Sequence, residues 1–267
     1  MTATSTNRRP TRGRKLIIAG LVVVGLLVAA DFGLAAAGEY QVAQKMRAKF
    51  QLADDPTVRI NGFPFIFQAL AGDYRDIEIA ATGVPVRDAL RDVEIRANLR
   101  HTRIGLSDLL AGNTRNGRID QVTGSVKIKS RDLNRLVNSV TPFSDMAIEP
   151  DNRPAATPTP TPVNPDPTKA AVKLSGSTTV AGRKIRLAAY GTVALVGGQV
   201  AVSVSDVELD DTSLAGLTEA LGVVKQALSV TIDPGALPFT VTPTAVRVES
   251  GALTVEGTVN DIPLDEG

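Results

Sequence analysis

Cysteine and tryptophan are absent from this 267-residue sequence, and histidine occurs once. The absence of cysteine excludes a disulfide framework, a thiolate metal site and a cysteine nucleophile. Aromatic residues make up only 4% of the chain, which argues against a cleft that stacks sugars. Because hydrophobic residues nevertheless reach 43%, the chain has enough apolar material for a large core, and that core must be mainly aliphatic.

Sequence motifs that carry chemistry are also missing. There is no Gly-x-Ser-x-Gly elbow, no His-Glu-x-x-His pair and no glycine loop that would cradle phosphate. His101 has basic and polar neighbours, as at an exposed strand end, and lacks the partners of a zinc site. Asp206, Glu208 and Asp210 share one strand face, where they would either bridge a cation or form a solvated acidic edge; the latter is favoured because no calcium-loop pattern surrounds them. The sequence therefore predicts no catalytic residue, no metal site and no cofactor, in a protein that is not an enzyme.

The charge is unevenly distributed along the chain, although the net charge is only +1. Residues 1–37 carry +4 (five basic, one acidic), residues 38–140 carry +4 (16 basic, 12 acidic) and residues 141–267 carry −7 (8 basic, 15 acidic). The chain without its N-terminus is thus mildly acidic, which makes nucleic acid an improbable partner.

The N-terminus has the pattern of a membrane-targeting segment. Five basic residues precede an unbroken apolar run from Leu16 to Ala30, and the run extends with one interruption, Asp31, to Ala37. Residues 16–37 are long enough to cross the cytoplasmic membrane with the N-terminus inside. Small-x-small patterns end at both Ala30 and Ala37, so an uncleaved anchor and a cleaved signal peptide both remain open. Either way, we expect residues 38–267 to be extracytoplasmic.

The remaining chain alternates between strand and helix patterns. Apolar residues alternate with polar ones in 93–99, 122–128, 185–189, 193–195, 200–209, 246–248 and 253–255, which is typical of antiparallel strands with one wet face. Gly197-Gly198 and Ser250-Gly251 are placed as hairpin turns. Single apolar stripes predict helices over 40–52, from Ser130 to Val140, and from Ser213 through Leu228. The fold class is therefore α+β with antiparallel sheet, preceded by a membrane helix.

A tract rich in proline and threonine interrupts the strand pattern. Seven of the eighteen residues from Pro150 to Pro167 are proline, which predicts an exposed, extended segment. It could separate two domains or be an insertion into one. We favour a disordered insertion, 148–168, within a single domain that covers 38–267, because neither side has a complete set of elements by itself.

The stretch from Asn61 to Tyr74 concentrates the large apolar side chains. It holds three of the seven phenylalanines and one of the three tyrosines. Asn61-Gly62 signals a turn, the residues from Phe65 to Leu70 can form a short helix, and Gly72 can end it. Ile77 and Ile79 then follow with strand period.

This stretch also carries a resemblance to a known family. The relevant segments are Val-Arg-Ile-Asn-Gly-Phe-Pro-Phe at 58–65, Gln-Ala-Leu-Ala-Gly at 68–72 and Tyr-x-x-Ile-x-Ile at 74–79, with looser matches at 106–110, 122–124, 237–239 and 246–257. Together they resemble an actinobacterial envelope family, the lipomannan elongation factor-like proteins, once catalogued as a domain of unknown function. The resemblance covers about residues 40–264. It implies phospholipid binding and a tubular lipid-binding fold, in which a curved antiparallel sheet wraps a long helix.

Two functions from different classes follow. The first is an extracytoplasmic phospholipid-binding protein that supports lipoglycan or envelope lipid assembly without catalysis, since apolar faces that do not quite close would hold acyl chains. The second is a structural or partner-binding envelope module with a solid core and no lipid. For the first, the lipid is expected to be anionic, and its expected contacts are Phe63, Phe65, Ile66, Phe67, Leu70, Ile77, Ile79, Arg59 and Arg75.

Overall fold

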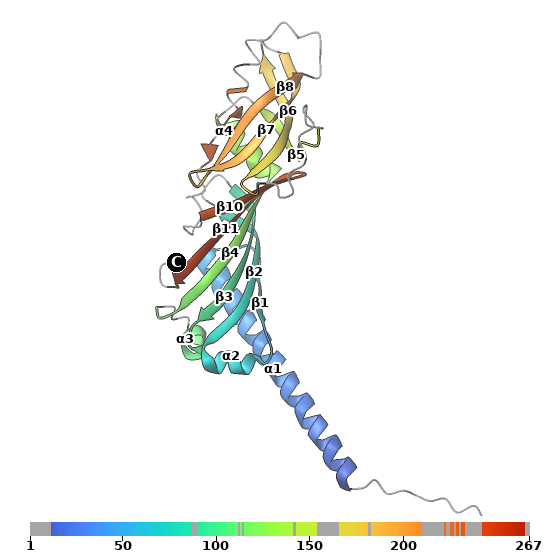
Figure 1. The fold of residues 1–267 in the computed structure, drawn as a ribbon, viewed down its shortest axis with the longest axis vertical. Coiled ribbons are helices and arrows are strands. Elements are labelled where there is room, and N and C mark those ends of the chain that lie inside the picture. The colour runs from blue at the N-terminus through green and yellow to red at the C-terminus, as the bar shows by residue number, and fades with distance from the viewer. Residues whose placement is uncertain are drawn as a thin grey trace, which may run out of the picture.

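The fold is α+β, with two antiparallel sheets and a long N-terminal helix (Figure 1). The computed structural model describes residues 12–86, 90–111, 113, 115–140, 143–153, 166–180, 183–209, 222, 225–226, 228–229, 231–232 and 242–264. The predicted helix from Ser213 lies largely outside these residues, although Leu228 near its end is buried. Both the α+β class and the antiparallel pairing that the alternating pattern predicts are confirmed.

Sheet A has six strands in the order β1-β2-β3-β4-β11-β10. Their bounds are β1 Thr57–Asn61, β2 Asp73–Val86, β3 Leu90–Arg103, β4 Arg118–Lys129, β10 Thr242–Glu249 and β11 Ala252–Pro263. The last strand of the chain pairs with β4 over its whole length, from Ala252 opposite Lys129 to Pro263 opposite Arg118. Residues from both sides of the proline-rich tract therefore build one sheet.

Sheet B has five strands in chain order. They are β5 Ser144–Pro150, β6 Lys169–Val180, β7 Arg183–Val196, β8 Gln199–Leu209 and β9 Thr231–Ile232. The predicted hairpin turns are confirmed: Gly197 and Gly198 join β7 to β8 with positive φ angles of 59° and 80°, and Gly251 lies between β10 and β11 with φ 80°. Glycine reaches these angles without the strain that a Cβ atom causes.

The proline-rich tract connects two neighbouring strands of sheet B. Pro150, the last residue of β5, lies opposite Val172 of β6, and the Asp151 N–H extends the ladder to the Ala171 carbonyl at 3.3 Å. Residues 148–150, which sequence analysis assigns to the insertion, are thus the end of β5, and Ile148 is buried. Residues 154–165 lie outside the described residues.

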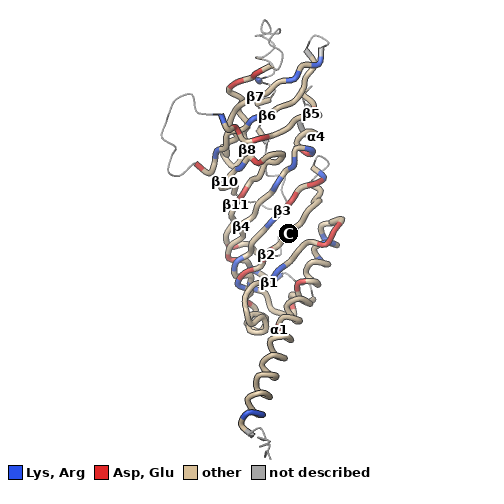
Figure 2. Tube along the Cα trace, turned by 90° about the vertical axis from the view of Figure 1, so that its right-hand side faces the viewer, with Lys and Arg blue, Asp and Glu red and all other residues tan. Residues whose placement is uncertain are grey.

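Helix α1 (Arg12–Phe50) is one continuous helix of 39 residues, about 58 Å long. It joins the apolar N-terminal run and the predicted helix of 40–52 without a break. Its first half projects from the rest of the molecule, and from Asp31 onward it makes contact with sheet A and its helices (Figures 1 and 2). Glu39 accepts the N–H of Ile60 at 2.7 Å, so α1 runs beside the edge strand β1. Among the described residues, one helix, Gly13–Phe50, is long and apolar enough to cross a membrane.

Three shorter helices complete the fold: α2 (Phe65–Ala71), α3 (Leu106–Ala111) and α4 (Ser130–Val140). The Lys45 ammonium of α1 donates to the carbonyl oxygens of Leu109 and Leu110 at the end of α3. Cations at a helix C-terminus satisfy carbonyl groups that have no partner within the helix. Figure 1 shows α2 and α3 at the end of the body where α1 enters it.

Two separate clusters of buried apolar residues hold the described part together. The upper core takes residues from both sheets and α4. Its members are Ile128, Leu133, Phe143, Met146, Ile148, Val172, Leu174, Leu187, Ala189, Val193, Val200, Val204, Leu228, Val246, Leu253 and Val255. The lower core is much smaller and lies where α1, α2 and α3 meet sheet A. It comprises Ile60, Phe65, Ala69, Tyr74 and Ile104.

Candidate functional site

Between the two cores, one face of sheet A carries aliphatic residues that belong to neither. We call it the inner face. Ile79 of β2, Leu99 of β3, Val122 of β4 and Val259 of β11 lie on it, and each is only half-buried. None of them joins the upper or the lower core among the described residues. The middle of the inner face is therefore apolar surface that the described part of the chain covers only in part.

Small side chains run across the middle of this face. In the register of the sheet, Ile79 lies opposite Ala97, Ala97 opposite Gly124, and Gly124 opposite Gly257. A Cβ atom on Gly124 would meet only the Arg96 carbonyl oxygen, at the ordinary distance of 3.7 Å, so space remains above it. The row thus carries little side-chain volume on three neighbouring strands, β3, β4 and β11.

Larger aliphatic residues flank the row of small ones on both sides. Toward α2, Ile77, Leu99, Val122 and Val259 form the adjacent row, and toward sheet B the row is Ala81, Ile95, Val126 and Val255. These three rows, which we call the trough, hold no charged side chain. Such a lining suits hydrocarbon, and it offers no general acid, base or nucleophile.

The lower core ends the trough at α2. Tyr74 is fully buried there, and its ring lies 6.2 Å from that of Phe65. Burial raises the pKa of the Tyr74 phenol above its ordinary value, because ionisation in this apolar setting would lose hydration. Gly38 of α1 packs on the same cluster, where a Cβ atom would lie 3.7 Å from the Phe65 ring.

Helix α2 is fixed to α1 by a single buried carboxylate. The two Asp31 oxygens accept the N–H groups of Phe65 and Ile66, each at 2.8 Å. These N–H groups belong to the first turn of α2, where no partner exists within the helix. Asp31 interrupts the apolar run of α1, and its carboxylate is 7% exposed because it serves as the cap for another helix.

The one polar side chain among the apolar residues of α2 also has a structural role. Gln68 is buried, donates to the carbonyl oxygens of Asn61 and Gly62, and accepts the Arg75 N–H at 3.1 Å. Gly62 has φ 105°, and a Cβ atom there would lie 2.8 Å from the Gln68 amide, so only glycine fits. Gly72 ends α2 in the left-handed region, as the sequence predicts. Gln68 thus ties α2 to β1, through Asn61, and to β2, through Arg75.

The predicted lipid-binding residues fall into three places. Phe65 is buried in the lower core, and Ile77 and Ile79 lie on the inner face. Four others form an exposed apolar patch on and beside α2, which we call the tip: Phe63 (59% exposed), Ile66 (37%), Phe67 (65%) and Leu70 (74%). Phe63 stacks on Phe32 of α1 with 5.8 Å between ring centroids. The sequence therefore groups residues that the fold separates into core, trough and tip.

The two predicted basic residues are exposed on different parts of the surface. Arg59 alternates with buried Val58 and Ile60 along β1, so it points away from the inner face. Arg75 lies beside the tip, where it helps to line a shallow pocket with Phe63, Phe67 and Asp73. This pocket holds about 150 Å³, well below the 300–1,000 Å³ typical of small-molecule sites, so a whole lipid would not fit in it.

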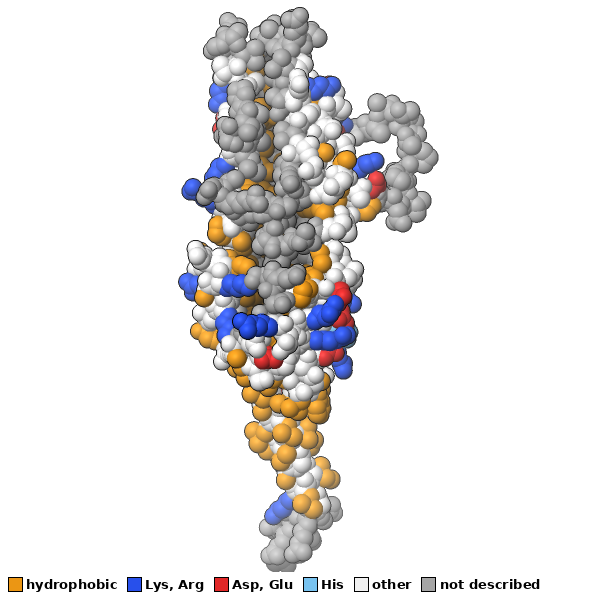
Figure 3. Space-filling view, turned by 90° about the vertical axis from the view of Figure 1, so that its left-hand side faces the viewer, with side chains coloured by type: hydrophobic (Ala, Val, Ile, Leu, Met, Phe, Trp, Pro, Cys, Tyr) orange, Lys and Arg blue, Asp and Glu red, His pale blue; other side chains and the backbone are white. Residues whose placement is uncertain are grey.

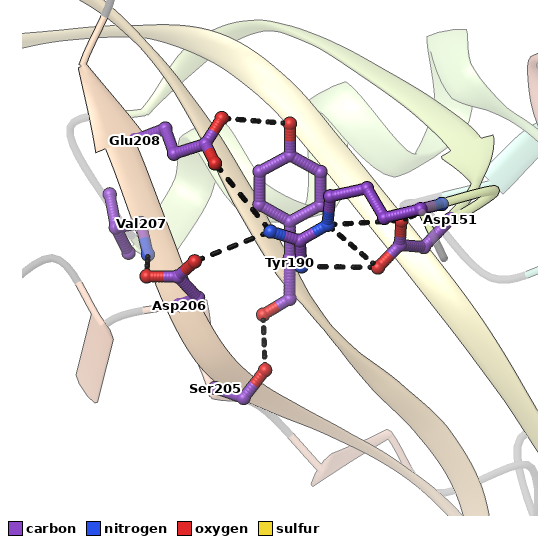
Figure 4. Close-up of polar contacts among 7 residues, drawn as sticks. Asp151, Tyr190, Ser205, Asp206, Val207 and Glu208 are labelled. Atoms are coloured by element: carbon purple, nitrogen blue, oxygen red, sulfur yellow. Dashed lines mark hydrogen bonds and ion pairs between the residues drawn. The ribbon is translucent and has the colours of Figure 1, made fainter. Parts of the chain in front are cut away.

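The acidic edge of β8 is not simply solvated. Asp206 and Glu208 lie 3.3 Å and 3.6 Å from the Arg153 guanidinium, which also binds Asp151. That guanidinium lies 3.2 Å from the centroid of the Tyr190 ring, and the Tyr190 hydroxyl donates to Glu208 at 3.1 Å (Figure 4). The described part of the chain has no cluster of three or more metal-ligating side chains, and Asp210 lies outside it.

Sequence reasoning missed several residues that shape this region. Asp31 and Gln68 are polar positions within apolar runs, and nothing in the sequence links either to its distant backbone partners. The row of Ala97, Gly124 and Gly257 could have been found, because each occupies an apolar position of an alternating strand. His101, expected at an exposed strand end, is exposed and pairs with Asp73 at 3.1 Å.

One family of known proteins matches most of the chain. No curated protein matches the chain. Residues 29–258 match the family described as LmeA-like phospholipid-binding, a range that includes α2, all of sheet B and all of sheet A except the end of β11. It also includes Asp31, the carboxylate that caps α2. Because the match covers most of the sequence, the chain belongs to the LmeA-like phospholipid-binding family.

Proposed function

We propose that this protein is an extracytoplasmic phospholipid-binding protein of the cell envelope, which supports lipoglycan or envelope lipid assembly without catalysis. The acyl chains lie along the trough of the inner face. The observation that carries the proposal is the row of small residues beside four half-buried aliphatic ones, Ile79, Leu99, Val122 and Val259, which belong to neither core among the described residues. Membership of a phospholipid-binding family supports it.

Burial of hydrocarbon alone supplies sufficient driving force. Each buried methylene contributes about 0.8 kcal/mol, so a sixteen-carbon tail offers on the order of 12 kcal/mol before the cost of ordering it. A ligand held this way needs no charged anchor. The absence of charged side chains from the three central rows of the inner face is consistent with that.

Helix α1 supplies the second wall of the trough in this proposal. Val42, Met46 and Phe50, which form its predicted apolar stripe, are half-buried, and α1 contacts both β1 and α3. Sheet A would then curve around the second half of α1, as in tubular lipid-binding folds. The head group is anionic and lies at the α2 end, where Arg75 is the nearest exposed cation of the predicted pair.

The proposed organisation is a membrane anchor followed by one domain. The apolar part of α1 crosses the cytoplasmic membrane, with Arg14 and Lys15 on the inner side, and residues 38–267 lie outside. The pairing of β4 with β11, and of β5 with β6, supports a single domain with the proline-rich tract as an insertion. Cleavage after Ala37 would remove the Asp31 cap from α2, which argues against that site, whereas an uncleaved anchor and cleavage after Ala30 both keep the cap.

Mass spectrometry of lipids that co-purify with the protein tests this function. A matched pair of variants makes the test specific: Val122→Asp places a charge on the inner face, and Thr123→Asp places it on the opposite face of the same strand. We expect the first to remove co-purifying phospholipid and the second to retain it, while both variants unfold cooperatively. Wild-type protein that carries no lipid and takes up none from vesicles would favour a structural module with a solid core instead.

A further inference from the structure

The location of the exposed tip at α2 indicates what it contacts. Its four members, Phe63, Ile66, Phe67 and Leu70, are large apolar side chains on the surface. The apolar surface of α1 begins beside them, since Phe32 is itself 62% exposed and stacks on Phe63. Figure 3 shows that hydrophobic side chains gather at this end of the body and continue onto α1.

The length of α1 sets the height of the tip above the inner side of a membrane. Lys15 ends the basic segment, and Asp31 follows sixteen residues later, which corresponds to about 24 Å along the helix. Ala35, which packs on the lower core, is about 30 Å from Lys15, and the hydrocarbon layer of a bilayer is about 30 Å thick. Tilting α1 would lower both heights. The start of α2, which binds Asp31, therefore lies several ångströms inside the outer boundary of the hydrocarbon layer, and the lower core lies at that boundary.

We infer that the tip is a membrane-inserting element, which holds the end of the trough in the outer leaflet of the bilayer that α1 spans. Apolar side chains at this depth replace contact with water by contact with acyl chains. This inference rests on the membrane anchor of the proposed function, and it does not depend on whether the inner face holds a lipid.

The Asp31 contact is what such a position requires. Unpaired carboxylates and unpaired backbone N–H groups are both costly near hydrocarbon. Here they satisfy one another, because Asp31 accepts from the first two residues of α2. Because each group satisfies the other, both Asp31 and the start of α2 can lie at the edge of the membrane.

The chain has no cysteine, so single-cysteine labelling needs no background substitutions. The full chain is reconstituted in phosphatidylcholine–phosphatidylglycerol vesicles with an environment-sensitive fluorophore at Phe67→Cys or Leu70→Cys. The control is Val196→Cys, which replaces an equally exposed apolar residue (61%) on sheet B. We expect blue-shifted emission at both tip positions, with loss of emission when lipids carrying a shallow spin label are present, and neither effect at Val196.

The alternatives give different results. Water-like emission at both tip positions, without quenching by spin-labelled lipid, overturns the inference. Blue-shifted emission that spin-labelled lipid does not quench overturns it in favour of protein contact, such as pairing of two copies through α2. Lipid that co-purifies with a chain whose tip is not quenched would leave the proposed function standing and remove only the membrane contact.

Discussion

The upper and lower cores are built from the same kinds of residue, but they differ in how much apolar surface they bury. The upper core buries sixteen described residues from both sheets and α4, and Val172 and Val193 are almost completely inaccessible. The lower core buries five, next to a trough of half-buried residues and an exposed tip. One end of the molecule is thus filled by its own side chains, and the other leaves apolar surface available.

The difference shows what an alternating pattern means. Val193 of β7 and Val122 of β4 both occupy apolar positions in alternating strands, yet the first is 1% exposed and the second is half-buried. The pattern determines which face of a strand is apolar. What covers that face depends on the arrangement of the sheets, and for Val122 we propose that a lipid does so.

A charge placed in the upper core should lower the stability of the fold more than any other change considered. Val172→Asp buries an unpaired carboxylate at a fully inaccessible position, which costs several kcal/mol against a typical total of about 5–15 kcal/mol. We expect the loss of a cooperative transition in thermal unfolding followed by circular dichroism. Val196→Asp, on the exposed end of β7, should unfold like the wild type. If Val172→Asp also did, the upper core would not be solid.

At the α2 end of the molecule, substitution of two phenylalanines that are two residues apart distinguishes the lower core from the exposed tip. Phe65→Ala removes a buried ring from the lower core and should lower the free energy of unfolding by about 3 kcal/mol. Phe67→Ala removes a ring that is 65% exposed and should change it by less than about 0.5 kcal/mol. Chemical denaturation of the full chain in detergent measures both. Equal losses would mean that the tip is part of the lower core.

Loss of the Asp31 cap should lower the stability of the fold by an intermediate amount. Asp31→Asn retains the shape but replaces two charge-assisted acceptors, which should cost about 1–2 kcal/mol. Hydrogen exchange should accelerate at the Phe65 and Ile66 amides more than in sheet B. Asp54→Asn, an exposed change near the end of α1, is the control. Unchanged exchange at both amides would show that Asp31 does not hold α2 in solution.

Elements with local signals were predictable from the sequence. The strand alternation, the glycine hairpins and the end of α2 at Gly72 depend on neighbouring residues, and the structure confirms them. The association with phospholipid was also predicted, and the family match supports it.

The geometry of the candidate site could not be predicted, because it depends on contacts between distant segments. Asp31 lies 34 residues before Phe65, and Asp132 accepts the N–H groups of Arg91 and Asp92 about 40 residues away. A single sequence contains no record of such pairings. Phe63, Phe65 and Phe67 look alike in the sequence for the same reason, although only the second is buried.

The smallest change in stability is expected on the polar outer face of sheet B, where Arg153 lies over Tyr190. Burial by itself raises the pKa of Asp151, but hydrogen bonds from the Arg153 side chain and backbone outweigh it and hold this pKa below its ordinary value of 3.8. The ionised form is therefore favoured by folding, so this stabilisation is present above about pH 4 and is lost as the pH falls through the lowered pKa. Arg153→Gln should lower the Tm slightly at neutral pH, and the difference from the wild type should disappear in acid.

Thermal unfolding between pH 7 and pH 3 measures this difference. Arg100→Gln, an exposed substitution on sheet A, controls for the loss of one positive charge and should give a smaller difference at neutral pH. A difference for Arg153→Gln that persisted at pH 3 would assign the effect to the stacking of its guanidinium on Tyr190, because that contact does not depend on ionised Asp151. The outer face of sheet B would then resemble the two cores, in which contact with an apolar surface matters more than charge.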